Sequence, residues 1–349
     1  MIDYTNCDIE RVSIHQLGNK TNGEELRLSN NVTDTSDLRV EELLFKFFLT
    51  PFAEPEFYIF SYTNGDFNLN PIYKFACEVF ETPKSLHKVS VNIAKHLYEL
   101  STHPQIKSGD LFVAYFTNVL IDGATVDALG IFKSENRQSF LKLDNAEKDF
   151  SIEYDSGINI DKLDKGCLIY NVAKDYGLKV AIIDRSNKAT EAQFWKESFL
   201  QLSPYNDDFH HTKEVMLLTK SFVTNRLTNE FEITKADQID LLNRSVDYFK
   251  STDTFDKKEF EKTVFQNNEM IKSFRNFDKE YQDINGIEID ETFEVSQQAV
   301  KKQSRFFKSV LKLDKNFHVY IHGDKNLIEK GFDAKTGLNF YKIYFTEER

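Results

Sequence analysis

The residues with the clearest chemical potential form a run of bases near the C-terminal end. Residues 295–313 contain four lysines, one arginine and no acid, and extension to residue 315 gives a local charge of 6 − 1 = +5. If the run is helical, four bases recur at i, i+4, i+7 and i+11, namely Lys301, Arg305, Lys308 and Lys312. Their side chains then fall within roughly 60° of one another around the helix axis. Such a ridge can neutralise several phosphates. The candidate phosphate-contacting residues are Lys301, Lys302, Arg305, Lys308 and Lys312.

The helical interpretation places apolar side chains opposite these bases, and it has two alternatives. The apolar ridge would contain Ala299, Phe306, Phe307 and Val310. In the first alternative, the basic face pairs with acids elsewhere, above all with the six acids of residues 280–294, which we expect to form an exposed loop. In the second, the helix ends near Ser309. Residues 310–313 would then form a hairpin with residues 317–321 and carry Lys312 away from the ridge.

The remaining candidates for catalysis are weaker. Asp184 follows a buried-strand pattern, and with Glu259 and Glu261 it would suit a metal-dependent nuclease, but turn or cap roles are commoner for such acids. The sequence has no glycine-rich phosphate loop, dinucleotide fingerprint, zinc-spaced cysteine pair or His-Glu-x-x-His motif. We therefore predict no catalytic residue, no metal site and no cofactor.

The histidines and the single tryptophan also favour structural roles. His210 and His211 are adjacent, so their side chains point to different sides of a helix or strand. His318 and His322 share strand parity, which favours an outward polar face. Trp195 lies in an apolar segment that is typical of a core.

Composition restricts where a polyanion could bind. The net charge is 44 − 56 = −12, which on average repels nucleic acids and anionic membranes. The longest uncharged run, residues 111–121, is shorter than the ~20 residues of a membrane helix. The first residues lack the segments of a signal peptide, and three scattered cysteines give no disulfide framework. We expect a cytoplasmic protein without membrane contact.

Hydrophobic periodicity predicts an α+β fold in two domains. In residues 1–189 we expect a mostly antiparallel sheet with strands near 12–17, 111–116, 126–132, 166–172 and 178–183, and a return strand near Leu26 and Leu28. Two helices are expected here, one capped by Asp37 and one containing Val89 and Ile93, with turns at residues 122–123 and 155–157.

Residues 190–349 show helical spacing instead. Three helices are predicted by the apolar sets Val215/Leu218/Phe222, Ile239/Leu242/Val246 and Met270/Phe274/Phe277. No proline follows Pro204, so the commonest helix breaker is absent from this half. A terminal strand pair is expected from residues 317–321 and 338–345.

Several segments together resemble the bacterial nucleoid-associated protein family of the NdpA type. The segments are Ile14-His15-Gln16-Leu17, residues 108–116 (SGDLFVAYF), residues 164–170 (DKGCLIY), residues 192–200 (AQFWKESFL) and residues 317–321 after the basic run. Their order and spacing extend over nearly the whole chain.

The resemblance implies a non-enzymatic, DNA-associated protein of the bacterial nucleoid and provides no catalytic residues. We therefore predict sequence-independent binding of double-stranded DNA through phosphate contacts, with a homodimer doubling the contacts. The alternative is a protein-interaction adaptor for a DNA-processing or defence system, with protein partners in DNA metabolism.

Overall fold

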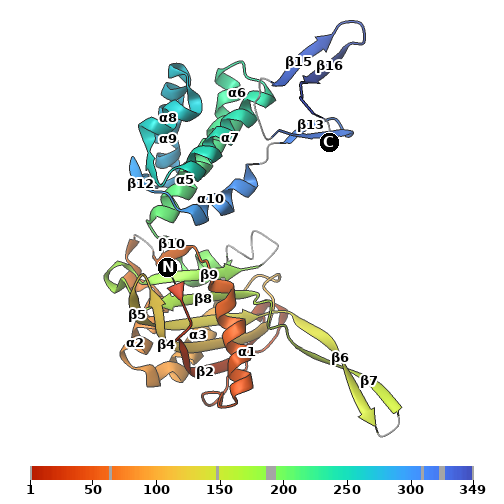
Figure 1. Cartoon of the computed structure of the whole chain (residues 1–349). Helices are drawn as coiled ribbons and strands as arrows, with labels where there is room; N and C mark the ends of the chain where they lie inside the picture. Colours follow the sequence, from red (N-terminus) through yellow and green to blue (C-terminus); the bar gives the residue numbers. More distant parts are fainter. Residues whose placement is uncertain are drawn as a thin grey trace. The chain divides into compact units, whose positions relative to one another are not determined.

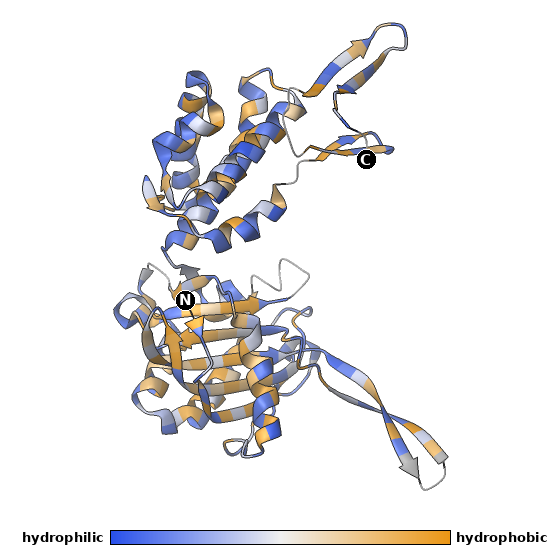
Figure 2. Ribbon diagram, viewed as in Figure 1, coloured by the Kyte–Doolittle hydropathy of each residue, from blue (hydrophilic) through white to orange (hydrophobic). Residues whose placement is uncertain are grey.

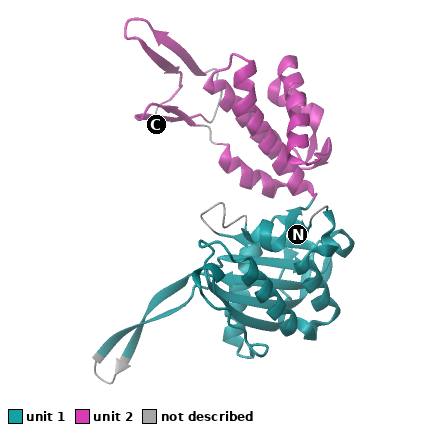
Figure 3. Ribbon diagram, turned by 180° about the vertical axis from the view of Figure 1, so that it is seen from behind, with its two compact units in different colours: residues 1–205 teal, residues 206–349 magenta. Residues whose placement is uncertain are grey.

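The chain folds into two compact units. The computed structural model describes residues 2–62, 65–146, 149–185, 194–307, 310–321 and 327–347. The units comprise residues 1–205 and 206–349 (Figure 3), whereas the sequence-based boundary lies at residue 189. Residues after that boundary stay with the first unit because Trp195 lies in its core and strand β10 (Leu202–Pro204) pairs with β3 (Phe57–Phe60).

The first unit contains an eight-stranded antiparallel sheet (Figure 1). The strand order is β1-β4-β5-β8-β9-β3-β10, and β2 pairs with β4. The remaining bounds are β1 (Ile2–Asp3), β2 (Asp8–Leu17), β4 (Gly109–Ile121), β5 (Ala124–Ser134), β8 (Lys165–Tyr170) and β9 (Lys179–Asp184). The α+β class and the antiparallel pairing of the expected strands are confirmed.

Helices bury both faces of this sheet. The helices are α1 (Leu38–Leu49), α2 (Pro71–Glu81) and α3 (Leu86–Leu100), with short 3₁₀ turns η1 (Lys20–Asn22), η2 (Thr50–Phe52), η4 (Phe67–Leu69), η5 (Pro83–Ser85) and η6 (Lys174–Tyr176). On β4, Val113 and Tyr115 belong to the cluster containing α2 and α3, whereas Phe112 and Phe116 pack with residues of α1. Because successive strand residues face opposite sides, double burial explains the long uncharged run of β4.

Local sequence signals correctly predicted the start of one helix and the turn between two strands. The Asp37 side chain accepts hydrogen bonds from the backbone N–H groups of Arg39 and Val40 and caps α1, as predicted. Residues 122–123 form the β4–β5 turn. The predicted return strand is wrong: its segment contributes only the isolated bridge between Gln16 and Arg27.

A long hairpin was missed by the sequence analysis. Strands β6 (Arg137–Ala146) and β7 (Asp149–Ile158) form a separate two-stranded sheet that extends away from the main sheet (Figure 1). The predicted turn at residues 155–157 is wrong because these residues lie inside β7, where Asp155 pairs with Phe140. The sequence Asp155-Ser156-Gly157 is typical of a turn, but its pairing with β6 keeps these residues in the strand.

The second unit is mainly helical, as predicted. Its helices are α5 (Asp208–Ser221), α6 (Leu227–Glu230), α7 (Lys235–Ser251), α8 (Lys257–Phe265), α9 (Asn268–Asn285) and α10 (Gln297–Gln303). The π-helical segment η8 (Phe222–Arg226) follows α5, and the 3₁₀ turn η9 (Ser304–Phe306) follows α10. The other π-helical segment, η7 (Phe194–Leu200), belongs to the first unit. The core includes Phe222, Phe249 and Phe260. No described helix is long and apolar enough to cross a bilayer.

Three small two-stranded sheets complete this unit, and the first of them joins strands on either side of α8 and α9. They pair β11 (Thr254–Asp256) with β12 (Thr292–Glu294), β13 (Val310–Leu313) with β14 (Phe317–Tyr320), and β15 (Ile328–Asp333) with β16 (Leu338–Ile343). Residues 317–321 and 338–345 were expected to pair with each other. Instead, β14 pairs with β13 and β16 pairs with β15. Residues 280–294 are not simply a loop, because α9 continues to Asn285, Gly286 caps it at φ 61°, and β12 follows.

Candidate nucleic-acid interface

The predicted basic ridge begins on α10. The Ser296 side chain caps this helix, and Ala299 and Val300 are buried against neighbouring helices, so Lys301 is exposed on the outer side. Figure 1 shows α10 beside α5 and α7. The N-terminal end of the ridge is therefore helical, and Ala299 faces inward, as predicted.

The ridge does not continue to Lys312 as a helix. The helical segment ends with η9 at Phe306, and Lys312 lies on β13 opposite His318. The continuous ridge is thus wrong, and the hairpin alternative is confirmed. Phe306 was assigned to the apolar side but is 61% exposed, because the 3₁₀ turn changes the angular spacing. Lys308 and His322 lie outside the described residues.

The remaining bases on α10 and η9 form what we call the α10 strip: Lys301, Lys302 and Arg305. The Lys302 ammonium lies 5.1 Å from the ring centroid of Phe209 on α5. The α5 helix adds Lys220, whose ammonium lies 5.8 Å from the ring centroid of Phe306. Each of these cation–π contacts pairs a base of one segment with an aromatic ring of the other.

The acids of residues 280–294 do not neutralise the strip in the part of the chain that the structure describes. Glu280 pairs with Arg226 at 3.5 Å, and Asp290 lies 3.4 Å from the imidazole of His211. Lys301 and Arg305 are exposed and form no ion pair with any described acid. The alternative of pairing with these acids is therefore contradicted for those two bases.

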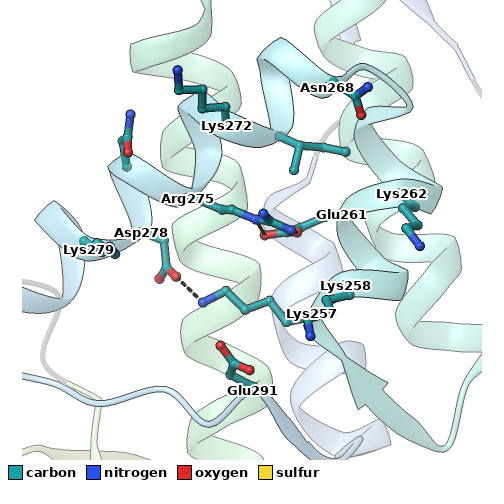
Figure 4. A pocket seen from close by; sticks show the side chains of 12 residues that line it. Lys257, Lys258, Glu261, Lys262, Asn268, Lys272, Arg275, Asp278, Lys279 and Glu291 are labelled. Carbon is teal, nitrogen blue, oxygen red and sulfur yellow. Dashed lines mark hydrogen bonds and ion pairs between the residues drawn. The ribbon is translucent and has the colours of Figure 1, made fainter.

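A second basic feature lies between α8 and α9. A pocket of about 710 Å³ has six bases and three acids in its wall, a balance of 6 − 3 = +3 (Figure 4). The charged lining residues are Lys257, Lys258, Glu261, Lys262, Lys272, Arg275, Asp278, Lys279 and Glu291. The helices that position them begin at side-chain caps, Asp256 for α8 and Asn267 for α9.

Two ion pairs fix the inner wall of this pocket. The carboxylate of Glu261, 1% exposed, accepts two hydrogen bonds from Arg275 Nε at 3.0 and 2.9 Å and one from Nη2 at 2.6 Å. These bonds raise the pKa of Arg275 above its usual value. The buried Asp278 pairs with Lys257 at 2.7 Å. Both acids are thus occupied by bases of the same wall.

Four lysines of this pocket lie outside the two ion pairs, and with Glu291 they account for the balance of +3. Lys258 and Lys262 extend from α8, and Lys272 and Lys279 from α9 (Figure 4). All four are exposed, and within the described ranges none of them forms an ion pair. We call them the pocket lysines.

Sequence reasoning missed the pocket lysines because no contiguous basic run marks them. A weaker signal was present: Lys258 and Lys262 are spaced i, i+4, while Lys272, Arg275 and Lys279 are spaced i, i+3, i+7, so each set shares one helix face.

Two of the proposed nuclease acids are held in ion pairs with bases of their own units. Asp184, in the first unit, forms an ion pair with Lys165 at 3.0 Å, and Glu261, in the second, is held by Arg275. No group of three or more histidines, cysteines, aspartates or glutamates that could hold a metal occurs among the described residues.

The other singled-out residues have structural surroundings. The ring of His211 stacks on Phe293 at 5.2 Å. Trp195 is fully buried and its indole N–H donates to the Gly166 carbonyl at 3.3 Å, in agreement with the predicted core role. His318 is exposed on β14.

Comparison with known proteins connects this geometry to a family. No curated protein matches the chain. The family model described as the nucleoid-associated protein YejK matches residues 13–336, which is most of both units. The chain therefore belongs to this family of nucleoid-associated proteins of the NdpA/YejK type, as the resemblance in the sequence predicted.

Proposed function

We propose that this protein is a non-enzymatic component of the bacterial nucleoid that binds double-stranded DNA through phosphate contacts made by its second unit. Family membership supports the nucleoid role and, with it, a cytoplasmic location. The observation that carries the DNA-binding proposal is the presence of exposed, unpaired bases in the second unit of a chain with net charge −12. These bases include the pocket lysines together with Lys301 and Arg305.

Their number matters because phosphate affinity is collective. Each base that neutralises a phosphate releases condensed counterions, and the dependence of binding on salt grows with the number of contacts. A base that is already paired with an acid displaces few counterions from DNA and therefore adds little to the affinity. The chain keeps bases unpaired although acids outnumber them, and this pattern suits a polyanionic ligand.

We propose that base sequence has little influence on this binding. Lysine ammonium groups contact phosphates as point charges and carry no direct base readout. The sequence contains no zinc finger, no RNP-like aromatic motif and no clear helix-turn-helix. Lys302, Lys308 and Lys312 remain candidate contacts alongside the unpaired bases.

Charge reversal of the strip tests the first site. Wild type should bind unrelated duplexes with similar affinity, and its affinity should fall steeply between low and high salt. The variant Lys301→Glu/Arg305→Glu/Lys308→Glu should bind at least about tenfold more weakly, with an unchanged circular dichroism spectrum. Unchanged affinity would remove the strip from the interface, and a wild type without salt-dependent binding would refute the proposed function.

A protein-interaction adaptor is the second candidate, and exposed apolar side chains on the β15–β16 hairpin favour it. Phe332 and Leu338 are 63% and 66% exposed. Purification of the protein from cells with and without nuclease separates the two functions. Partners that persist after DNA digestion would support the adaptor, whereas their loss would favour DNA binding.

A further inference from the structure

The β6–β7 hairpin presents a one-sided apolar surface. In its register Leu141 pairs with Tyr154 and Leu143 with Ile152, so these four side chains share one face with Phe150. Their exposed fractions range from 68% to 79%. Figure 2 shows hydrophobic and hydrophilic residues alternating along both strands. We call these five residues the arm face.

The opposite face of the hairpin carries most of its charged side chains, with acids in excess over its one lysine and with Phe140 as a half-exposed apolar side chain. Lys142 pairs with Asp155 at 2.7 Å and lies opposite Glu153 in the register. Asp144 and Ser151 also form a cross-strand pair on this side. Contact through the arm face would therefore bury no charged side chain of these pairs.

The base of the hairpin is firmly held. The Asp164 carboxylate, in the segment before β8, accepts hydrogen bonds from the backbone N–H groups of Glu135 and Asn136 at 2.7 and 3.1 Å. Arg137, the first residue of β6, pairs with Asp110 at 2.7 Å. These contacts fix the direction in which the hairpin leaves the sheet and reduce the entropy lost on docking.

The exposed apolar area is too large to be incidental. With roughly 150–250 Å² for a fully exposed large side chain, the five residues of the arm face leave about 700 Å² in water. Monomers rarely expose contiguous apolar patches of this size. A standard protein interface takes about 800 Å² from each partner, so two such faces together supply the area of one stable interface.

We propose that the arm faces of two copies of this chain pack on one another around a twofold axis and form a homodimer. An isolated two-stranded hairpin is marginally stable, and a second apolar layer stabilises it. Two ribbons packed face to face make a small four-stranded sandwich with both polar faces in water. A twofold contact requires a self-complementary surface, and an uncharged, flat strand face meets that requirement between chains of equal negative charge. The inference does not depend on DNA binding.

A matched pair of charge insertions tests the proposal without DNA. Light scattering after size exclusion should give wild type a mass of twice the 40.7 kDa chain. Ile152→Lys places a charge in the arm face twice per dimer and should weaken association at least about 100-fold. Ser151→Lys places the same charge one residue away, opposite Asp144 on the polar face, and should leave the dimer intact.

Crosslinking distinguishes this contact from other dimers. In a Cys77→Ser background, Leu143→Cys lies near the centre of the arm face and should form a disulfide-linked dimer on mild oxidation, whereas Ser151→Cys should not. Cys7 and Cys167 are buried and should not interfere. A wild type that stays monomeric at about 100 µM, above the micromolar limit of such interfaces, would overturn the proposal. A dimer that is unaffected by Ile152→Lys would overturn it as well.

Discussion

Replacement of three pocket lysines with glutamine should reduce the salt dependence of DNA binding by a calculable amount. The variant is Lys258→Gln/Lys262→Gln/Lys272→Gln. Each side chain is exposed and forms no ion pair in the described part of the chain, so each is free to neutralise one phosphate. The slope of log affinity against log salt changes by about 0.9 for each contact, so loss of three contacts should make it shallower by about 2.7.

The same relation gives the loss of affinity. At about 0.1 M salt a slope contribution of 0.9 corresponds to about eightfold, so three contacts correspond to an upper limit of about 500-fold. Glutamine keeps the length and helix propensity of the side chains nearly unchanged. The Glu261–Arg275 and Asp278–Lys257 pairs are left in place, so the fold should survive.

Fluorescence anisotropy with a labelled duplex at several salt concentrations measures both quantities. The control variant, Lys74→Gln/Lys84→Gln/Lys95→Gln, removes three exposed lysines from the first unit and changes the net charge equally. It should retain the wild-type slope. An unchanged slope in the pocket variant would refute the reasoning, and an equal loss in the control would show that net charge, rather than this site, governs binding.

Two further predictions concern stability. Burial lowers the pKa of His15 from 6.5 to about 4, so the unfolded chain takes up this proton first as the pH falls. The free energy of unfolding should therefore decrease by up to about 3 kcal/mol between pH 6.5 and 4. Urea unfolding at several pH values should show a smaller decrease in His15→Gln, and equal decreases would contradict this origin. Arg275→Ala leaves the Glu261 carboxylate buried without its partner and should lower the free energy of unfolding by about 3 kcal/mol. Glu261→Gln in the Arg275→Ala background should recover much of that loss in the same assay, and no recovery would assign the loss to other contacts.

Local sequence patterns predicted most elements of the fold. Helices α5, α7 and α9 follow the apolar spacing of Val215, Ile239 and Met270, and Asp37 caps α1 as expected. Such features depend on neighbours within one or two turns, which the sequence lists directly. The hairpin at residues 310–320 was also within reach, as an alternative, because its strands are adjacent in sequence.

Features that depend on distant contacts were not predicted. The pocket lysines come from two helices and are interspersed with acids, so no local charge run distinguishes them. The partners of Glu261 and Asp278 decide that Lys258 and Lys262 stay unpaired. The β6–β7 hairpin is a local feature and was missed for a different reason, because the turn-like residues 155–157 suggested a break where the strand continues.

The sequence by itself determined the α+β class, the helical second half and the presence of a basic segment in an acidic chain, because periodicity and charge are local properties. Family membership was also recognisable from motifs spread over the chain. Only the tertiary structure decided where the basic ridge ends, which bases escape pairing and which apolar residues remain in water. Those properties arise from packing between segments far apart in the chain, and burial and ion pairing are set by that packing.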